Sequence, residues 1–291
     1  MQTNAWVILS INKSLMDMVK TFNNTINKNW IEWFIGFCDA DANFQVFPKL
    51  RSYVKKDGTT SNYYNVGYGF HISLSSKDLP LLLDIQTRLN NIGHIYEYPS
   101  RDEARFAVTK LAELKYLIEN VFDLSHLITE HQRSRFAILR YGVLNKFNRV
   151  ETMEEYKEFI NSEYELSPVL ESYYKEGTAF DNWIIGFING EGCFNLHNRG
   201  HLVFYIEHTD ENSLDLIKKR LDLGPNVLDR GNRNDTRQNT YSLSISSKKD
   251  LLSLRELLEN PLLNRLQGYK LVQYNNWHLN KNMEEVDNRA L

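Results

Sequence analysis

The chain has 291 residues, 42% hydrophobic and 12% aromatic, which is enough for a sizeable core in one large domain or two modest ones. No apolar run approaches the roughly 18–20 residues that a membrane-spanning helix needs, so we expect no membrane partner. The two cysteines, Cys38 and Cys193, argue against a disulfide framework and favour a reducing compartment.

The formal net charge of −3 is unevenly distributed along the chain. Nine acids but only Lys157 and Lys175 lie between Glu151 and Asp181, so this segment carries −7 and the rest of the chain +4. Charge asymmetry of this kind matters more than the total. We interpret residues 142–181 as a solvated acidic linker, and the basic remainder can still form a binding groove.

Residues 1–28 are polar and rich in asparagine, with Asp17 the only acid. They contain too little arginine for a transit peptide, and they lack the apolar core of a secretory signal. We therefore expect an N-terminal extension at 1–28, and a short C-terminal tail at 281–291.

The first predicted helix contains the sequence WFIGFCDADANF at Trp33–Phe44, and a near copy, WIIGFINGEGCF, stands at Trp183–Phe194. The copies align without gaps and place Asp41 opposite Glu191. Asn29 and Glu32 have the spacing of a capping box ahead of the first copy. Such internal repetition indicates that the fold itself is repeated.

The repeat continues beyond the helix. FHISLSSKD at Phe70–Asp78 aligns with FYIEHTDEN at Phe204–Asn212, and FAVTKLAEL at Phe106–Leu114 aligns with LSISSKKDL at Leu243–Leu251. We therefore predict two α+β repeats, 29–141 and 182–280. Each would read helix, two strands, helix, two strands, helix, with antiparallel sheets whose outer faces are free to bind a ligand.

Alternation along the first predicted strand separates two faces. One face carries Phe44, Val46, Pro48 and Leu50, and the other carries Gln45, Phe47, Lys49 and Arg51. The second repeat places Asn195, His197 and Arg199 on the corresponding polar face. Residues 53–62 read as a hairpin loop that turns on Asp57 and Gly58.

A second polar hairpin, DRGNRNDTRQN, spans Asp229–Asn239 and includes Arg230, Arg233 and Arg237. A core does not require long hairpins rich in arginine and amides. We interpret them as segments that follow a groove in a ligand.

Small residues recur one turn apart in both motif helices: Gly36, Ala40, Gly186 and Gly190. Because they remove the side chains that keep helices apart, we expect the two helices to pair closely. Pairing would bring Asp41 and Glu191 together at helix ends that already bear partial negative charge. A divalent cation, with hard oxygen ligands of the kind Mg²⁺ prefers, would relieve this arrangement, and we include the neighbouring Ala42 and Gly192 among its candidate ligands.

The paired motifs, FIGFCDADA at 34–42 and IIGFINGEG at 184–192, resemble those of the LAGLIDADG homing endonuclease family in its single-chain form with two repeats. The resemblance covers roughly residues 30–280. It implies that the motif helices form the interface between the repeats, that Asp41 and Glu191 bind metal, and that the two sheets form a saddle over the DNA major groove. A sheet or ribbon fits that groove, where side chains distinguish all four base pairs.

The resemblance also implies functional residues outside the motifs. The strand residues Gln45, Lys49, Arg51, Asn195, His197 and Arg199 correspond to DNA contacts. Arg265 lies where the family tends to place a lysine near the metals, and His131 is its nearest counterpart in the first repeat. His208 occupies, with Leu74, a strand-end position that often carries a water-binding amide.

The sequence departs from the family pattern at Ala42 and Asn189, and Ile35 and Ile185 are bulkier than the family's usual alanine. Ala42 replaces the usual glycine after the first acid, which bears on the turn into the first strand and on the aim of Asp41. Asn189 replaces the usual first acid of the second motif. Both metal-binding acids, Asp41 and Glu191, are kept.

The resemblance favours a monomeric, site-specific endonuclease that cuts double-stranded DNA at a long asymmetric target with Mg²⁺. Mn²⁺ would be an alternative ion, and Ca²⁺ one that supports a non-cleaving complex. An RNA maturase that binds its host group I intron is the alternative, and an inactive DNA-binding relative is a third reading. Family membership further implies a gene within a mitochondrial intron.

Overall fold

The computed structural model describes residues 26–197, 201–232 and 238–279. Most of the expected N-terminal extension and all of the C-terminal tail lie outside these ranges. In the described part, no helix is both long and apolar enough to cross a bilayer.

The first repeat places a motif helix ahead of two pairs of strands. Its elements are α2 (Lys28–Asp41), β1 (Ala42–Val54), β2 (Thr60–Ser75), α3 (Leu79–Arg88), β3 (His94–Tyr98), β4 (Glu103–Val108), α4 (Leu111–Asn120) and α5 (Glu130–Leu144). The strands form one antiparallel sheet in the order β1-β2-β4-β3.

The second repeat follows the same order. Its elements are α8 (Ala179–Glu191), β6 (Gly192–Leu196), β7 (Leu202–His208), α9 (Glu211–Arg220), β8 (Leu228–Asp229), β9 (Tyr241–Ile245), α10 (Lys248–Leu258) and α11 (Gly268–His278). Its sheet has the order β6-β7-β9-β8. The predicted pair of α+β repeats with two antiparallel sheets is confirmed, and each repeat ends with one further helix, α5 or α11.

The segment that joins the repeats is not simply a solvated linker. It contains β5 (Arg149–Val150), α6 (Met153–Asn161) and α7 (Glu171–Lys175), and β5 pairs with β2. Tyr156 and Phe159 of α6 are buried, and the Tyr156 hydroxyl donates to the Val46 carbonyl on the outer edge of β1 at 2.9 Å. This segment therefore covers part of an edge strand that would otherwise expose unpaired backbone groups.

The beginning of α2 corrects the predicted capping box. Asn27, not Asn29, caps the helix, because its side chain accepts from the Trp30 amide. Glu32 is buried and accepts hydrogen bonds from Ser125 and, at 2.8 Å, from Tyr173 of α7. Burial raises the pKa of Glu32, and its hydrogen bonds join α2 to the segments that carry Ser125 and Tyr173.

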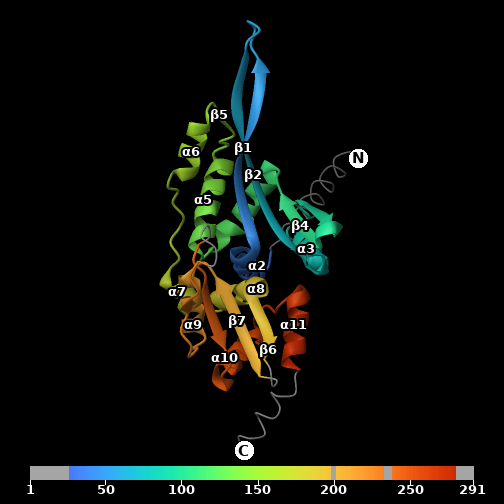
Figure 1. Ribbon diagram of the computed structural model, residues 1–291, viewed down its shortest axis with the longest axis vertical. Helices are drawn as coiled ribbons and strands as arrows, with labels where there is room; N and C mark the ends of the chain where they lie inside the picture. The colour runs from blue at the N-terminus through green and yellow to red at the C-terminus, as the bar shows by residue number, and fades with distance from the viewer. Residues whose placement is uncertain (1–25, 198–200, 233–237, 280–291) are drawn as a thin grey trace, which may run out of the picture.

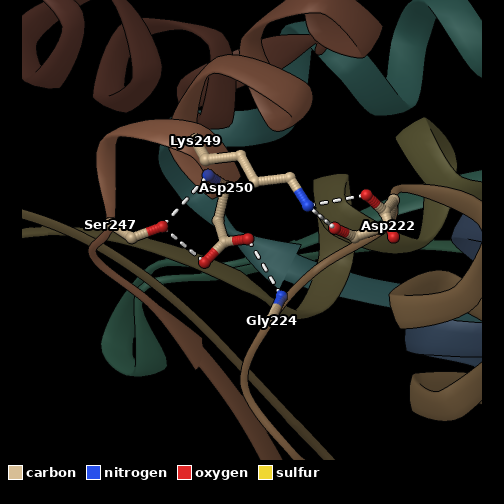
Figure 2. Close-up of polar contacts among 5 residues, drawn as sticks. All are labelled: Asp222, Gly224, Ser247, Lys249 and Asp250. Atoms are coloured by element: carbon tan, nitrogen blue, oxygen red, sulfur yellow. Dashed lines mark hydrogen bonds and ion pairs between the residues drawn. The ribbon is translucent and has the colours of Figure 1, made fainter.

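A buried acid also fastens α10 to the turn that follows α9. Figure 2 shows Asp250 accepting from the Gly224 amide at 2.9 Å and from the Ser247 hydroxyl at 2.6 Å, beside an ion pair between Lys249 and Asp222. In the first repeat, Glu113 of α4 accepts from the Gly93 amide in the corresponding place. The repetition thus extends to the hydrogen bonds that hold each helix to its sheet.

The motif helices α2 and α8 lie side by side at the centre of the molecule, and the two sheets extend from them in opposite directions (Figure 1). The backbones touch at two glycines. A Cβ on Gly36 would lie 2.0 Å from the Trp183 carbonyl oxygen, and one on Gly186 would lie 1.8 Å from that of Trp33. Any larger residue would force the helices apart.

We predict that Gly36→Ala and Gly186→Ala will each lower the free energy of unfolding by about 2 kcal/mol or more. The new methyl group would clash with the backbone of the other helix, and this overpacking costs more free energy than the higher helix propensity of alanine contributes. Urea titration followed by circular dichroism measures the loss. Gly224→Ala is the control, because its Cβ would meet Asp250 only at an ordinary 3.7 Å. Equal stability of all three variants would contradict the close pairing.

Candidate active site and nucleic-acid interface

Asp41 and Glu191 end the two motif helices and lie in one electrostatic environment. A Cβ on Gly190 would lie 2.8 Å from the Asp41 carboxylate, so Asp41 packs directly against α8. Burial raises the pKa of Asp41 to about 6, with Lys270 opposing the rise and Asp78 adding to it. Burial, followed by the charge of Asp41, raises the pKa of Glu191 to about 7.

Lys270 is the cation that acts on both acids, and the sequence interpretation missed it. Its ammonium group donates to the Gly192 carbonyl at 2.6 Å, and burial lowers its pKa. It occupies the first turn of α11, where Asp78 of the first repeat accepts from the Tyr269 amide at 2.6 Å. A contact between the repeats therefore fixes the helix end that carries Lys270.

The first repeat places an uncharged residue where the second has Lys270. Gln132, third in α5 as Lys270 is third in α11, donates to the Ala42 carbonyl at 2.6 Å and to the Cys38 carbonyl at 3.2 Å. The Ala42 and Gly192 carbonyls, expected as metal ligands, thus each already accept from a side chain. This geometry leaves the carboxylates as the better candidate ligands.

Ala42 is accommodated without strain. It adopts φ −83° and ψ 160°, and its amide donates to the Cys38 carbonyl at the end of α2. Because this φ is negative, the position does not require glycine. The turn into β1 is therefore formed as at Gly192, which has φ −67° and ψ 141°.

The other motif acid, Asp39, has a structural position. It is fully buried and accepts from the Ile128 and Thr129 amides, from the Thr129 hydroxyl and, at 2.8 Å, from the Trp183 indole of α8. Burial raises its pKa to about 7. Asn189, its counterpart, accepts from the Gln267 amide at 2.6 Å, so both positions anchor the start of a repeat's last helix.

The acid pair fits a hard divalent cation. Both side chains offer oxygen, and burial, followed by the charge of Asp41, raises the pKa of Glu191, so a cation here would stabilise its charged form. Within the described ranges, no group of three or more His, Cys, Asp or Glu side chains forms a complete protein cage. An ion here would complete its coordination with water and phosphate oxygens, as Mg²⁺ commonly does.

His131 and His208 form a separate pair whose ring centroids are 5.5 Å apart. His208 also packs 5.0 Å from Phe187, one turn before Glu191 on α8, and its Nδ1 accepts from the Asp210 amide. Burial, with His131 nearby, lowers the pKa of His208 to about 4. Both rings therefore remain neutral near pH 7, with roles that stay predictions.

Arg265 has an exposed side chain in the segment before α11, and Lys270, not Arg265, is the cation that opposes the burial-raised pKa values of Asp41 and Glu191. The sequence contains Lys270 only five residues further on. Lys270 differs from Arg265 in its position, because it lies in the first turn of the last helix of its repeat. Gln132 has the same position in the last helix of the first repeat. That equivalence becomes visible only when the caps of α5 and α11 are known.

The strand candidates lie on the outer faces of the two sheets, opposite the helices. Gln45, Lys49 and Arg51 alternate along β1, whose ladder pairs them with Gly69, Asn65 and Tyr63 of β2. Asn195 and His197 are exposed along β6 and just beyond it, and Arg230 is exposed where it follows β8. Arg199, Arg233 and Arg237 lie outside the described residues.

The expected apolar face of each first strand ends earlier than predicted. Leu50 is 56% exposed and Leu196 48% exposed, because none of the described helices covers the strands that far from the centre. The predicted loop at 53–62 is also shorter, since β1 continues to Val54 and β2 begins at Thr60. The first hairpin is consequently a long two-stranded ribbon.

Two basic residues on the first outer face were not anticipated. Arg105 of β4 lies opposite Ser73 of β2, and Arg149 of β5 lies opposite Asn65. Residues paired across neighbouring strands share a face, so both arginines join the surface that carries Lys49 and Arg51. Arg149 was hidden in the sequence because it belongs to the segment interpreted as an acidic linker.

Residues 34–139 match the family described as LAGLIDADG endonuclease. Among curated proteins, the chain is 26% identical over 265 residues to the "Probable intron-encoded endonuclease Cox1-I1b" of Schizosaccharomyces pombe, covering 86% of this chain and 63% of the relative. It is 26% identical over 208 residues to the "Probable intron-encoded endonuclease 2" of Neurospora crassa, covering 62% of this chain and 45% of the relative. The chain thus spans between about half and two thirds of these relatives' lengths.

Solved structures share the fold. The I-LtrWI LAGLIDADG homing endonuclease bound to target DNA has a TM-score of 0.64 and 22% identity, covering 89% of this chain and 92% of that chain. The LAGLIDADG meganuclease I-CpaMI bound to uncleaved DNA has a TM-score of 0.63 and 18% identity, covering 88% and 92%.

Two repeats joined through paired motif helices, each with an outward-facing antiparallel sheet, define a single-chain LAGLIDADG fold. The first repeat matches the LAGLIDADG endonuclease family at residues 34–139, the second motif at 184–192 repeats the pattern, and the chain shares the fold of the single-chain LAGLIDADG endonucleases.

We predict that Glu191→Gln will become stabilising relative to the native chain as pH rises. The folded-state pKa of about 7 exceeds the ordinary 4.5, so the stability contributed by the protonated acid is full below about pH 4.5 and is lost as pH rises to 7. Between pH 5 and 8 in metal-free buffer, we expect the free energy of unfolding of the variant to rise by about 2 kcal/mol relative to that of the native chain, as measured by urea titration. Glu119→Gln on the exposed face of α4 is the control, and equal pH profiles for all three proteins would exclude a raised pKa at Glu191.

Proposed function

We propose that this chain is a site-specific endonuclease that cuts both strands of DNA with the help of a divalent metal ion. The observation that carries the proposal is the pair of acids, Asp41 and Glu191, which close helix packing holds together at the junction of two outward-facing sheets. Two partly buried carboxylates in one place do not stabilise the fold. A site that cleaves phosphodiesters, however, needs such a pair to hold its metal ions.

Asp41 and Glu191 would hold the metal ions, each acid close to one of the two strands. Metal bound there would supply the positive charge that activates water and stabilises the leaving oxygen of a phosphodiester. Lys270, whose ammonium group acts on both carboxylates, would bind phosphate or orient water on the second-repeat side. Asp78 and Asp39 would act as positioning residues, through the hydrogen bonds that fix α11 and α5.

The outer faces of the two sheets would bind DNA in the major groove. The basic and amide residues of β1, together with Arg105 and Arg149, supply the first face, and Asn195, His197 and Arg230 supply part of the second. Because these sets differ, the target would be asymmetric in sequence. One chain supplies both repeats, so a monomer would suffice, and the names of the relatives favour an intron-encoded protein that acts in a mitochondrion.

We predict that Asp41→Asn and Glu191→Gln will each reduce double-strand cutting at least about a thousandfold while largely sparing DNA binding, since each removes one anionic ligand of a metal that the reaction requires. The target is a duplex recovered from a randomised library, and gel-shift titration in Ca²⁺ measures binding. Mg²⁺ should also raise the melting temperature of the native chain more than that of either variant. Normal cutting by both variants would refute the metal assignment.

We predict unequal cutting of the two strands, because Lys270 has the uncharged counterpart Gln132. A supercoiled plasmid carrying the target should pass through a nicked intermediate, and end-labelled duplexes should show one strand cut first. Lys270→Met should slow that first strand by about a hundredfold, the scale of one positioned charge, and should slow the other strand less. Identical rates for the two strands would show that the asymmetry has no kinetic role.

A further inference from the structure

A cavity of about 400 Å³ lies between the first repeat and the segment that joins the repeats. Its walls are one face of α5, residues 122–127 and residues 165–167. The last of these belong to residues 162–170, which connect α6 to α7 with neither helix nor strand and which we call the strap. Figure 1 shows the strap running beside α5. No strand residue lines the cavity, so it is separate from the sheet faces considered above.

Part of the lining is apolar. Phe122, in the short helix η3 (Phe122–Leu124), and Phe136 of α5 are both buried, with ring centroids 5.1 Å apart. Leu127 is buried as well, and Leu166 of the strap is half-buried. Cavities of this size that bind small molecules combine such an apolar lining with a few placed polar groups.

Arg133 is the charged group of the lining whose pairing is incomplete. It is half-buried on α5, where its Nη1 donates to the Leu127 carbonyl at 2.9 Å and its Nη2 donates to the Ser167 carbonyl at 3.3 Å. Both acceptors are neutral, and no ion pair between described residues includes Arg133. A guanidinium has five N–H donors, so donors and a full positive charge remain for an anion.

The other charged groups of the lining leave this cation uncompensated. Arg140 donates twice to Asp123, at 2.8 and 3.0 Å, so these two charges cancel. Glu165 of the strap is exposed, and solvent screens its charge. Burial lowers the pKa of His126, and the charge of Arg133 lowers it further, so this imidazole is neutral near pH 7 and offers hydrogen bonds without charge.

We propose that this cavity binds a small organic anion with an apolar body, whose carboxylate pairs with the Arg133 guanidinium and whose body packs against Phe122 and Phe136. A carboxylate matches the planar fork of a guanidinium, which gives the pair both strength and direction. An inorganic anion would satisfy Arg133 but would leave the apolar lining in contact with water. The site is independent of the proposed endonuclease activity.

A ligand in this position would fasten the strap. It would contact the α5 wall and the strap together, and so would favour the closed arrangement over one in which the strap has moved away. The strap leads directly into α7, where the Tyr173 hydroxyl donates to Glu32 of the motif helix α2 at 2.8 Å. Occupancy would therefore stabilise the path from the first repeat to the helix pair.

Isothermal titration calorimetry of the full chain with three probes tests the class of ligand. 4-Phenylbutyrate supplies an anion and an apolar body, 4-phenylbutanamide keeps the body without the charge, and acetate keeps the charge without the body. We expect a dissociation constant of about 1 mM or lower for 4-phenylbutyrate, a reasonable value for a ligand of that size. Each of the other two probes should bind at least about tenfold more weakly.

Variants locate the site. Arg133→Met keeps the apolar stem and should weaken 4-phenylbutyrate binding at least about tenfold, whereas Arg133→Lys keeps the charge and should lose less. Ser167→Phe should also weaken binding by narrowing the cavity, and it spares the bond to Arg133, which the backbone carbonyl accepts. Arg135→Met is the matched control, because Arg135 is exposed on α5 and does not line this cavity. Circular dichroism checks that each variant is folded.

Limited proteolysis after glutamate measures the strap itself. Glu163 and Glu165 are both exposed there. With 4-phenylbutyrate at ten times its dissociation constant, cleavage at these sites should slow about tenfold, because binding to the closed arrangement reduces the open population by that factor. The ligand should not slow cleavage of Arg133→Met.

Several results would overturn the proposal. These are equal affinity for 4-phenylbutyrate and its amide, no binding of any probe at millimolar concentration, or native affinity in both Arg133→Met and Ser167→Phe. Binding that leaves strap cleavage unchanged would also overturn it, because the ligand would then lie elsewhere. None of these assays contains DNA or a metal ion, so their failure would leave the endonuclease proposal unaffected.

Discussion

Contact between the backbones of α2 and α8 is the constraint on which the rest of the molecule depends. Gly36 and Gly186 allow each helix to reach the carbonyl of a tryptophan on the other, and no larger side chain would permit it. The contact continues to Gly190, which packs against Ala40 and Asp41 at the ends of the helices. Asp41 and Glu191 therefore lie at the same junction. The strands that follow leave that point in opposite directions, and this turns one helix pair into the centre of a two-sided surface.

The two acids of the first motif separate into two tasks by environment. Asp39 is surrounded by donors and fastens α5 and α8, whereas Asp41 raises the pKa of Glu191 and Lys270 acts electrostatically on both of these acids. Asn189 repeats the fastening role with a neutral oxygen, and the buried Trp33 indole, which corresponds to Trp183, has no hydrogen-bond partner among the residues that the structure describes. A buried donor without an acceptor costs free energy, so Trp33 lacks the stabilisation that Asp39 gives to Trp183.

The two repeats differ from one another on both sides of the helix pair. The lysine at the acid pair belongs to the second repeat, whereas the long ribbon and the additional strand β5 belong to the first. Two copies of one fold therefore need not perform equal shares of binding and chemistry. The joining segment contributes to this asymmetry, because it covers the edge of β1 and adds Arg149 to the outer face.

The sequence by itself determined the repetition, the motif helices and their glycines, the pairing of Asp41 with Glu191, and the order of strands and helices. These features are local or depend on a fixed register, and alternation and helical spacing report them directly. The positions of Lys270, Gln132 and Arg149 depended on tertiary structure, because each is set by a contact between segments far apart in the chain. Asp78 fixes the start of α11 across the repeats, and β5 joins a strand about eighty residues before it. Tertiary structure also decided how far the apolar face of β1 is buried. Leu50 has the alternating position of a core residue, but only the folded arrangement shows that none of the described helices covers it.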